Sequence, residues 1–447
     1  MTQQLSGWGK TPASFPAKLI QPTSDQEILE VLSGPLRTAP RGLGRSYGDA
    51  AQIAAGLVLD LTRLKPTFEL DEKTGLLTVS AGYSLGEILE RTLPRGWFIP
   101  VTPGTRFVTV GGAVASDVHG KNHHRDGSFS MHLSNLELLT PSGAMTLTSS
   151  DPAFAATAGG MGLTGVVSKI TVKLLAVETS LIRAVTVPTR SLAETFEAMT
   201  RDDEYTYAVA WIDATATGSR LGRGLASFGE HAKIDELFGR TIDQPLAYHP
   251  KAVATIPVSA PSQLLNPLTV RLFNSAWFQA GAARCGEKIT SLDGFFYPLD
   301  AVGSWNRLYG RRGFLQYQVV VPYGSEELIE TIIGRLAAGG HPSFLSVLKR
   351  FGEQSMGLLS FPKPGWTLAL DIPAKRPGLG ELLRDFDRRV AAAGGRVYLA
   401  KDGRLDPELL ETMYPNLRKF EEICHNLDPE GIMATDLARR LRIGGRH

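Results

Sequence analysis

The hydrophobic pattern of the first 180 residues predicts short strands and short helices with glycine-rich loops between them. Residues Val166-Val-Ser-Lys-Ile-Thr-Val-Lys-Leu174 alternate apolar and polar side chains, as a half-buried strand does. A helix is predicted from Ser24, because this capping residue is followed by Glu27 and by apolar residues at helical spacing. Further strands are predicted at 56–61, 76–80, 133–139 and 144–148, and a further helix after Gly82.

The pattern changes near residue 180, where the predicted strands carry longer aromatic and β-branched side chains. These strands lie at 184–187, 205–213 and 314–322, with helices at 191–199 and 325–338 between them. We therefore predict an antiparallel sheet with covering helices, an α+β domain. Residues 240–280 are rich in proline and alanine with scattered apolar residues, which favours a mobile loop able to act as a lid and to meet a lipid surface.

The last 54 residues return to a glycine-rich strand pattern. A strand is predicted at 394–404, ending in a polar turn, and short helices follow at 407–413, at 420–427 and from Asp436. No internal repeat is evident.

Composition describes a globular protein with two domains. The chain has 447 residues, 43% of them hydrophobic and 21% charged, and a net charge of +2, which excludes a general attraction to nucleic acid. Two cysteines, Cys285 and Cys424, cannot form a disulfide framework. Because the N-terminal residues lack an apolar signal core and no run is long enough to span a bilayer, we expect a cytoplasmic protein and leave peripheral membrane contact open.

Candidate chemistry is concentrated in residues 100–124. Small residues between Gly104 and Ser116 let the backbone approach a ligand and leave N–H groups free to bind it. Titratable side chains follow at once, including His119 and Lys121. The alternatives are a solvated surface loop, a helix-start phosphate loop, whose spacing does not match, and a metal site built on His119 and His123. We expect no metal, because Gly and Asn between these histidines disfavour a helix and no cysteine accompanies them.

Two more glycine-rich loops flank this segment in the chain. Arg41-Gly-Leu-Gly-Arg-Ser-Tyr-Gly-Asp49 contains donors able to meet a phosphate or a ring, and Gly159-Gly-Met-Gly-Leu-Thr-Gly165 leads into a predicted strand. Each loop is a weak signal alone. Together they predict one extended ligand lying across the ends of several elements.

These loops resemble the flavin-binding loops of the vanillyl-alcohol-oxidase type of FAD oxidoreductases. The residues that carry the resemblance are 41–49, Pro103-Gly-Thr105, Thr109-Val-Gly-Gly-Ala113 and His119-Gly-Lys-Asn-His-His124. Later motifs are similar to one branch of this family, and the resemblance runs in order from about residue 7 to 440. These motifs are Tyr297-Pro-Leu-Asp300, Trp305-Asn-Arg-Leu-Tyr-Gly310, Gly313-Phe-Leu-Gln-Tyr-Gln318, Ser343-Phe-Leu-Ser-Val-Leu-Lys349, Gly365-Trp366 and Tyr398-Leu-Ala-Lys-Asp-Gly-Arg404.

The resemblance implies an α+β fold of two domains. An FAD-binding domain would comprise residues 1–178 and the returning residues 396–447, and an antiparallel-sheet substrate domain, 179–395, would be inserted between them. The break that the hydrophobic pattern places near residue 180 agrees with this division.

The resemblance also implies the residues that hold FAD. They are Gly42, Leu43, Gly44, Arg45, Ser46, Tyr47, Pro103, Gly104, Thr105, Thr109, Val110, Gly111, Gly112, Ala113, Ser116, His119, Gly120, Gly162, Val167, Tyr398 and Lys401. Some relatives carry near Tyr47 a histidine that bonds covalently to the flavin. Tyrosine does not form that bond, so we predict non-covalent FAD.

Catalytic roles follow from the same resemblance for Lys401, His119 and Tyr47. Lys401 matches a lysine beside the flavin and the substrate, where a cation stabilises the anion of the reduced flavin and orients a hydroxyl. His119 would either relay the hydroxyl proton or bond structurally to the flavin or backbone, and the sequence leaves both open.

The implied substrate is a polyprenylphosphoryl-β-D-ribose, oxidised at C2 to the 2-keto sugar. A separate NAD(P)H-dependent keto-reductase would then complete an epimerisation to the arabinose form, used for cell-wall arabinan. The implied substrate-binding residues are Lys121, Trp211, Tyr297, Arg307, Gln316, Gln318, Lys349 and Thr367. The alternatives are an FAD-dependent oxidase of a soluble sugar, alditol or aldonolactone, and a flavin-binding partner protein without turnover.

Two positions depart from the family pattern. Ala369 stands where the branch has a cysteine, so we expect covalent trapping through a thiol at this position to fail. Met161 stands where the third glycine loop has a polar residue, so one flavin or substrate contact is expected to be missing.

Overall fold

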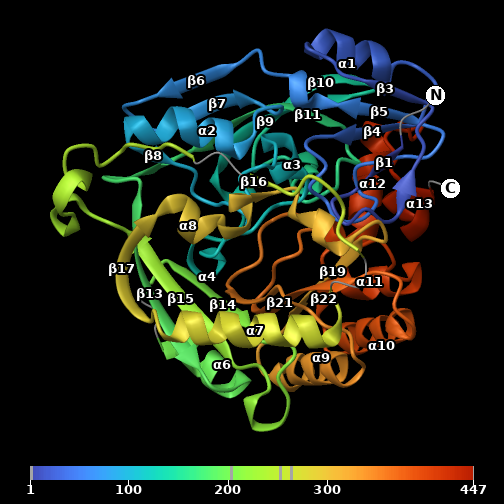
Figure 1. Cartoon of the computed structure of the whole chain (residues 1–447). Helices are drawn as coiled ribbons and strands as arrows, with labels where there is room; N and C mark the ends of the chain where they lie inside the picture. The colour runs from blue at the N-terminus through green and yellow to red at the C-terminus, as the bar shows by residue number, and fades with distance from the viewer. Residues whose placement is uncertain (1–3, 202–204, 251–253, 262–264, 446–447) are drawn as a thin grey trace.

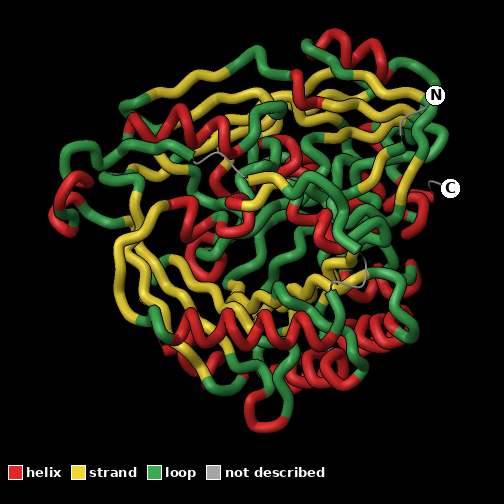
Figure 2. Tube along the Cα trace, viewed as in Figure 1, coloured by secondary structure: helices red, strands yellow, loops and turns green. Residues whose placement is uncertain are grey.

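The computed structural model describes residues 4–201, 205–250, 254–261 and 265–445. Figure 1 shows two layers of strands, one formed by the blue-green first part of the chain and one by the green-to-orange middle part. Figure 2 shows the same two layers, with helices on their outer sides and with both helices and loops between them. The candidate site lies in this intervening space.

The first layer holds a parallel sheet and an antiparallel sheet. The parallel sheet has the order β3-β5-β4, formed by Lys18–Ile20, Leu57–Asp60 and Thr38–Arg41. The antiparallel sheet has the order β10-β9-β11-β7-β6, formed by Gly143–Leu147, Leu133–Thr140, Val166–Lys173, Leu76–Ser80 and Phe68–Asp71. Its helices are α1 (Asp25–Leu32), α2 (Leu85–Thr92), α3 (Val110–Ala115), α4 (His123–Asp126) and α5 (Pro152–Thr157).

Helix starts in this layer follow the capping signals of the sequence. The Ser24 side chain accepts a hydrogen bond from the backbone N–H of Glu27, which begins α1 as predicted. Ser84 and Glu87 form a reciprocal capping box at the start of α2. Thr109 caps α3 by accepting from the N–H of Gly112. The glycine-rich segment 109–115 is therefore a helix start, which its spacing had not suggested.

The second layer is an eight-stranded antiparallel sheet, in which the order of the strands differs from their order along the chain. Its order is β17-β13-β15-β14-β20-β21-β19-β22, formed by Gly286–Ser291, Leu181–Thr189, Gly224–His231, Tyr207–Ile212, Ser346–Phe351, Gly365–Pro373, Phe314–Val321 and Arg396–Val397. Its helices are α6 (Leu192–Arg201), α7 (Pro267–Ala282), α8 (Leu292–Phe296), α9 (Glu326–Ala338) and α10 (Leu379–Ala392). Neighbouring strands run antiparallel throughout.

Successive side chains along these strands point to opposite faces of the sheet. We call the face that packs against the helices the core face and the opposite one the site face. Tyr317, Leu348 and Leu370 are buried in one hydrophobic cluster with residues of α6, α9 and α10. The neighbouring residues Gln318 and Lys349 point the other way and line a cavity. The sheet thus presents its polar residues to the site.

The tail packs back against the first layer. Thr38 N donates to Ile432 O and Ala434 N donates to Thr38 O, and Arg440 makes a bidentate ion pair with Asp49. Figure 1 shows the red tail helices beside the blue N-terminal elements. The tail helices are α11 (Leu410–Met413), α12 (Leu417–Leu427) and α13 (Asp436–Leu441), and the remaining short strand pairs are β1 (Leu5–Ser6) with β2 (Ala13–Ser14), β8 (Trp97–Phe98) with β12 (Leu175–Ala176), and β16 (Ala254–Thr255) with β18 (Val302–Gly303).

The segment 240–280 corrects the prediction of a loop. Residues 267–282 form α7, whose start is fixed by the Asn266 side chain accepting from the N–H groups of Leu268 and Thr269. Its apolar residues are scattered around the helix and few are buried, so the sequence showed no one-sided helical pattern. Residues 251–253 and 262–264 of this segment lie outside the described residues.

Candidate active site

One cavity of about 1,310 Å³ lies between the glycine loops of the first layer and the site face of the large sheet. Ordinary ligand pockets measure roughly 300–1,000 Å³. This cavity therefore has room for a large cofactor together with a second molecule.

Nearly all of the residues expected to hold FAD line this cavity. The lining set is Gly42, Leu43, Gly44, Arg45, Ser46, Tyr47, Pro103, Gly104, Thr105, Thr109, Gly111, Gly112, Ser116, His119, Gly120, Gly162, Val167, Tyr398 and Lys401. Val110 and Ala113 differ from the expectation. They lie on the inner side of α3, fully buried in the hydrophobic core of the first layer.

The glycine loops form a cradle of backbone that fits FAD. A Cβ at Gly104 would meet no atom within 4 Å, so this backbone faces open cavity. A Cβ at Gly42 would lie 2.1 Å from Oγ1 of Thr109, so two of the loops approach as closely as glycine allows. Gly162 and Met161, in the third loop, both adopt left-handed backbone (φ 74° and 53°) and line the cavity.

The first loop is clamped between two distant parts of the chain. Trp8 N donates to Ser46 O at 2.8 Å, and Tyr47 N donates to Ala400 O at 2.9 Å. A Cβ at Gly48 would lie 1.7 Å from the carbonyl oxygen of Asp402. Residues near 8, 47 and 401 are therefore held as one unit at the cavity wall.

Three lysines place positive charge in the cavity. Burial lowers the pKa of Lys401 to about 7, that of Lys349 to about 8 and that of Lys121 to about 7. The Lys401 ammonium lies 3.8 Å from the centre of the Tyr47 ring, and Lys121 donates to the backbone oxygen of Phe295. Crowded cations with lowered pKa values indicate a cavity suited to an anionic ligand.

His119 is held as a neutral ring. Burial and the charges of Lys349 and His123 hold its pKa well below the ordinary value. The amide nitrogen of Gln318 donates to Nε2 of His119 at 3.1 Å, which places the ring proton on Nδ1. Nδ1 is buried without a hydrogen-bond partner among the described residues. Because Nε2 already accepts a hydrogen bond from Gln318, the structure favours a structural role for His119 over a role as relay of the hydroxyl proton.

His119 and His123 do not share a ligand position. The N–H of Gly352 donates to Nδ1 of His123, whose Nε2 pairs with the Ser128 hydroxyl. The described residues contain no group of three His, Cys, Asp or Glu side chains arranged to hold a metal ion.

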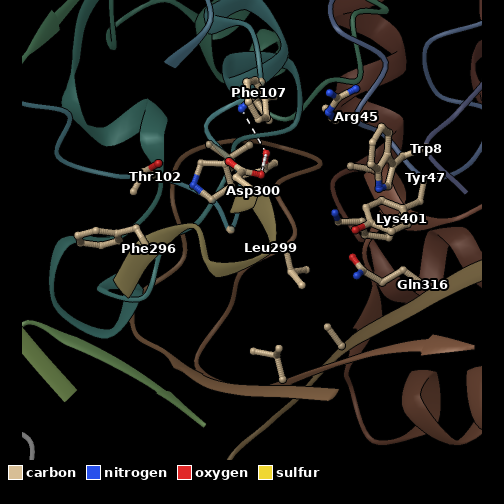
Figure 3. A pocket seen from close by; sticks show the side chains of 18 of the residues that line it. Trp8, Arg45, Tyr47, Thr102, Phe107, Phe296, Leu299, Asp300, Gln316 and Lys401 are labelled. Carbon is tan, nitrogen blue, oxygen red and sulfur yellow. Dashed lines mark hydrogen bonds between the residues drawn. The ribbon is translucent and has the colours of Figure 1, made fainter. Parts of the chain in front are cut away.

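One wall of the cavity brings together side chains from three segments. Figure 3 shows Tyr47, Lys401 and Gln316 on this wall, across from Asp300 and Leu299. Gln316 lies on β19 and donates from Nε2 to Oδ1 of Asp371 on β21 at 2.6 Å. Asp371 was not expected from the sequence, where it is the single charged residue of a mostly apolar strand.

Asp300 is a second acidic residue of the site to which the sequence patterns assigned no role. It accepts from the Thr105 hydroxyl at 2.7 Å and from the backbone N–H of Arg106 at 2.8 Å. It thereby fixes the loop around Gly104. Its place in the motif Tyr297-Pro-Leu-Asp300 was a usable signal.

Five expected substrate residues line the cavity and three do not. Those that line it are Lys121, Trp211, Gln316, Gln318 and Lys349. Tyr297 is buried with its hydroxyl paired to Thr102, and Thr367 accepts from Gln318 behind the wall. Arg307 donates to the carbonyl oxygens of Ile256 and Pro257, so it fixes the 254–260 segment instead of pointing into the cavity. Trp211 lines the cavity with its indole N–H donated to Phe344 O.

Ala369 lines the cavity on β21, opposite Gln318 of β19. Position 369, where the family branch has a cysteine and this chain has alanine, therefore faces the cavity.

The cavity mouth is apolar. Phe273 and Trp277 of α7 line it and are about half exposed, at 49% and 51%. Leu299 and Val302 line it from another segment. The cations Arg284 and Lys288 also line the cavity, just after α7. An amphiphile with an anionic group and an apolar chain matches this arrangement.

Comparison with known proteins agrees with a flavin site. A family model described as FAD binding domain matches residues 16–149, and one described as D-arabinono-1,4-lactone oxidase matches residues 370–441. The first match contains two of the three glycine loops. The expectations of FAD as cofactor and of an α+β flavin-oxidase fold are confirmed.

Individual relatives extend over the whole chain. The chain is 41% identical to the decaprenylphosphoryl-β-D-ribose oxidase of Mycolicibacterium smegmatis, over 99% of this chain and 98% of that protein. It is 39% identical to an uncharacterised protein of Streptomyces coelicolor, over 80% of this chain and 99% of that protein. A weaker similarity, 27% over 39% of this chain and 41% of the relative, links it to the L-gulono-1,4-lactone dehydrogenase of Mycobacterium tuberculosis.

Proposed function

Because this chain belongs to the family of the decaprenylphosphoryl-β-D-ribose oxidases, we propose that it oxidises the C2 hydroxyl of a polyprenylphosphoryl-β-D-ribose to the 2-keto sugar. One observation supports this substrate class most strongly. The same cavity is lined by the glycine loops, by Lys401 and Gln316, by the cations Lys121 and Lys349, and by the half-exposed aromatic residues Phe273 and Trp277. The sugar would meet Lys401 and Gln316, the phosphate would meet the cations, and the polyprenyl chain would meet the aromatic residues.

The residues of the wall perform separate tasks in this proposal. FAD, when bound, would accept the hydride that leaves the carbon of the oxidised hydroxyl, and the proton of that hydroxyl would leave to solvent. The Lys401 ammonium donates to the oxygen of that hydroxyl, and Gln316, whose amide nitrogen is occupied by Asp371, presents its carbonyl oxygen as an acceptor. Lys349 and Lys121 supply positive charge for the phosphodiester-like group.

Product analysis tests the assigned substrate. The holoenzyme is given polyprenylphosphoryl ribose and an artificial electron acceptor, and the lipid-linked product is examined by mass spectrometry. We expect a loss of two hydrogen atoms from the pentose. Turnover of alditols or aldonolactones with an unchanged lipid-linked ribose would instead favour the lactone-oxidase alternative, which the match at residues 370–441 makes the relevant rival.

The apolar mouth predicts a specific effect of chain length. Replacing Trp277 with alanine removes a half-exposed aromatic side chain from the path of the polyprenyl chain. Burying such a side chain is worth about 1.5–3 kcal/mol, so KM for a long-chain substrate should rise roughly tenfold or more. Steady-state kinetics with a short-chain analogue should show little change.

Phe15→Ala is the matched control, because Phe15 is a 57% exposed aromatic residue that does not line the cavity. It should leave KM for both substrates unchanged. An equal rise of KM for short and long chains in Trp277→Ala would contradict contact between α7 and the chain.

The proposal also covers partners, domains and location. The 2-keto sugar would be consumed by a separate NAD(P)H-dependent keto-reductase, completing an epimerisation. We further propose that residues 179–395 are a substrate domain inserted in an FAD domain of residues 1–178 and 396–447. The contacts of the tail with Thr38 and Asp49 support that division.

Within the described part of the chain each helix is too short or too polar to cross a membrane. Peripheral membrane contact through the lipid-binding mouth is part of the proposal.

A further inference from the structure

A buried carboxylate stands directly behind the catalytic wall without an assigned role. Asp371 lies on β21, two residues from Ala369 and on the same, site-facing side of the sheet. Its side chain is fully buried and does not itself line the cavity. A buried charge is costly unless it has partners, so its surroundings are informative.

The contacts of Asp371 connect it to the wall on one side only. Its Oδ1 accepts from the Gln316 amide at 2.6 Å, and its backbone N–H donates to Leu345 O. Its Oδ2 is buried and has no hydrogen-bond partner among the described residues. The charged and titratable groups that face this carboxylate are Lys401 from the tail, Tyr47 from the first glycine loop and Tyr309 from the 305–309 turn.

We propose that Asp371 is a positioning residue, which fixes the Gln316 amide through Oδ1 and serves as the counter-charge of the Lys401 ammonium. The proposal rests on the proposed oxidation of a hydroxyl at this wall. It adds a residue that neither the motifs nor the comparisons assign.

The hydrogen bond explains how Gln316 is oriented. With Nε2 donated to the carboxylate, the amide cannot flip without placing its carbonyl oxygen against Oδ1. The carbonyl oxygen of Gln316 is therefore directed away from Asp371 and remains available to accept from a substrate hydroxyl. An apolar side chain in place of Asp371, which has no acceptor oxygen, would remove this preference.

The charge explains how Lys401 remains a cation. Burial and the neighbouring Lys349 lower the pKa of Lys401, and Asp371 is the group that raises it. Burial raises the pKa of Asp371 itself to about 7, against the opposing effects of the Gln316 hydrogen bond and of Lys401, so Asp371 becomes a counter-charge as the pH rises through that value. His119, also close, is neutral. Without the carboxylate, Lys401 loses its proton at a lower pH, and the wall loses its hydrogen-bond donor.

Asp371→Asn tests this directly, because asparagine keeps the shape and the acceptor oxygen and removes only the charge. In the wild-type enzyme, kcat should fall as pH rises through the pKa of Lys401, which is about 7 before an anionic ligand adds its charge. In Asp371→Asn this midpoint should move down by about one pH unit, a roughly tenfold loss of kcat above both midpoints. Activity at the acid end should be largely kept.

A second readout does not depend on the substrate. The visible absorbance of bound FAD is titrated with pH, since the charge of a neighbouring lysine changes the flavin spectrum. Its midpoint should shift in the same direction in Asp371→Asn. If this spectral midpoint shifts in Asp371→Asn but the wild-type enzyme does not oxidise the lipid-linked ribose, the substrate assignment fails and the role of Asp371 stands.

Asp387→Asn is the matched control. Asp387 is also buried and ionically paired, with Arg404, but lies on α10 away from the cavity. It should lower thermal stability without moving either midpoint. If Asp371→Asn behaves likewise, with a loss that is uniform in pH, the role is merely structural and the proposal is overturned.

Asp371→Glu covers the case in which the asparagine variant does not load FAD. The glutamate variant keeps the charge and should load FAD with the wild-type spectral midpoint. If neither variant loads FAD, neither the shape nor the charge of aspartate is sufficient alone, Asp371 is needed to form the site at all, and the proposal is again overturned.

Discussion

Replacing Lys401 with methionine should lower kcat by about 10²–10³-fold while FAD stays bound. Removing one donor that stabilises developing charge typically costs this much. Methionine keeps much of the length of the side chain without its charge, and the burial that lowers the pKa of Lys401 shows that the ammonium is stabilised poorly by the protein alone. Stability should therefore be unchanged or higher. Rapid anaerobic reduction of bound flavin by substrate, followed by stopped-flow absorbance, measures the effect.

Lys363→Met is the control for this substitution. Lys363 is also a partly buried lysine with a lowered pKa, but it donates to Gly394 O and does not line the cavity. It should keep the wild-type rate. Full activity in Lys401→Met would remove this residue from the mechanism, and loss of FAD alone, without a change in the rate of the loaded fraction, would assign it to binding.

Replacing Gly48 with alanine should unfold the clamp around the first glycine loop and abolish FAD binding. Its Cβ would lie 1.7 Å from the carbonyl oxygen of Asp402 and 2.5 Å from the carbonyl carbon, both backbone atoms that a side-chain rotation cannot move. Overpacking costs about 1–3 kcal/mol and more where backbone must shift. We expect a loss of about 3 kcal/mol or more, measured by chemical denaturation, with little flavin absorbance in the purified variant.

The matched glycine is Gly380 in α10. A Cβ there would lie 3.9 Å from Nη1 of Arg384, at the flexible end of that side chain, and alanine favours the helix. Gly380→Ala should be neutral or stabilising and should retain FAD. Retention of FAD and stability by Gly48→Ala would show that the 46–49 loop is not clamped against the tail.

The glycine loops could be found from the sequence because their chemistry is local. Backbone that must approach a ligand requires small residues in short runs, and Gly42, Gly104 and Gly162 each belong to such a run and line the cavity. The predicted strands and the helix starts at Ser24 and Ser84 are equally local, because alternation and caps involve neighbouring residues.

The features that the sequence did not predict depend on contacts between residues that are far apart in the sequence. Asp371 meets Gln316 only because β19 and β21 pair in one register, which no local pattern specifies. Tyr297 and Arg307 belong to motifs of the family, yet neither points its polar atoms into the cavity. The Tyr297 hydroxyl pairs with Thr102, and Arg307 donates to two backbone carbonyl oxygens. Helix α7 was read as a loop because its apolar residues serve an exposed mouth and not a buried core.

The most direct test of the account is an anaerobic absorbance spectrum of the purified holoenzyme before and after polyprenylphosphoryl ribose is added. The account predicts that the oxidised flavin band bleaches in proportion to the lipid-linked ribose, and that acid precipitation releases all of the FAD into solution. A band that persists with this substrate but bleaches with a simple alditol or aldonolactone would contradict it.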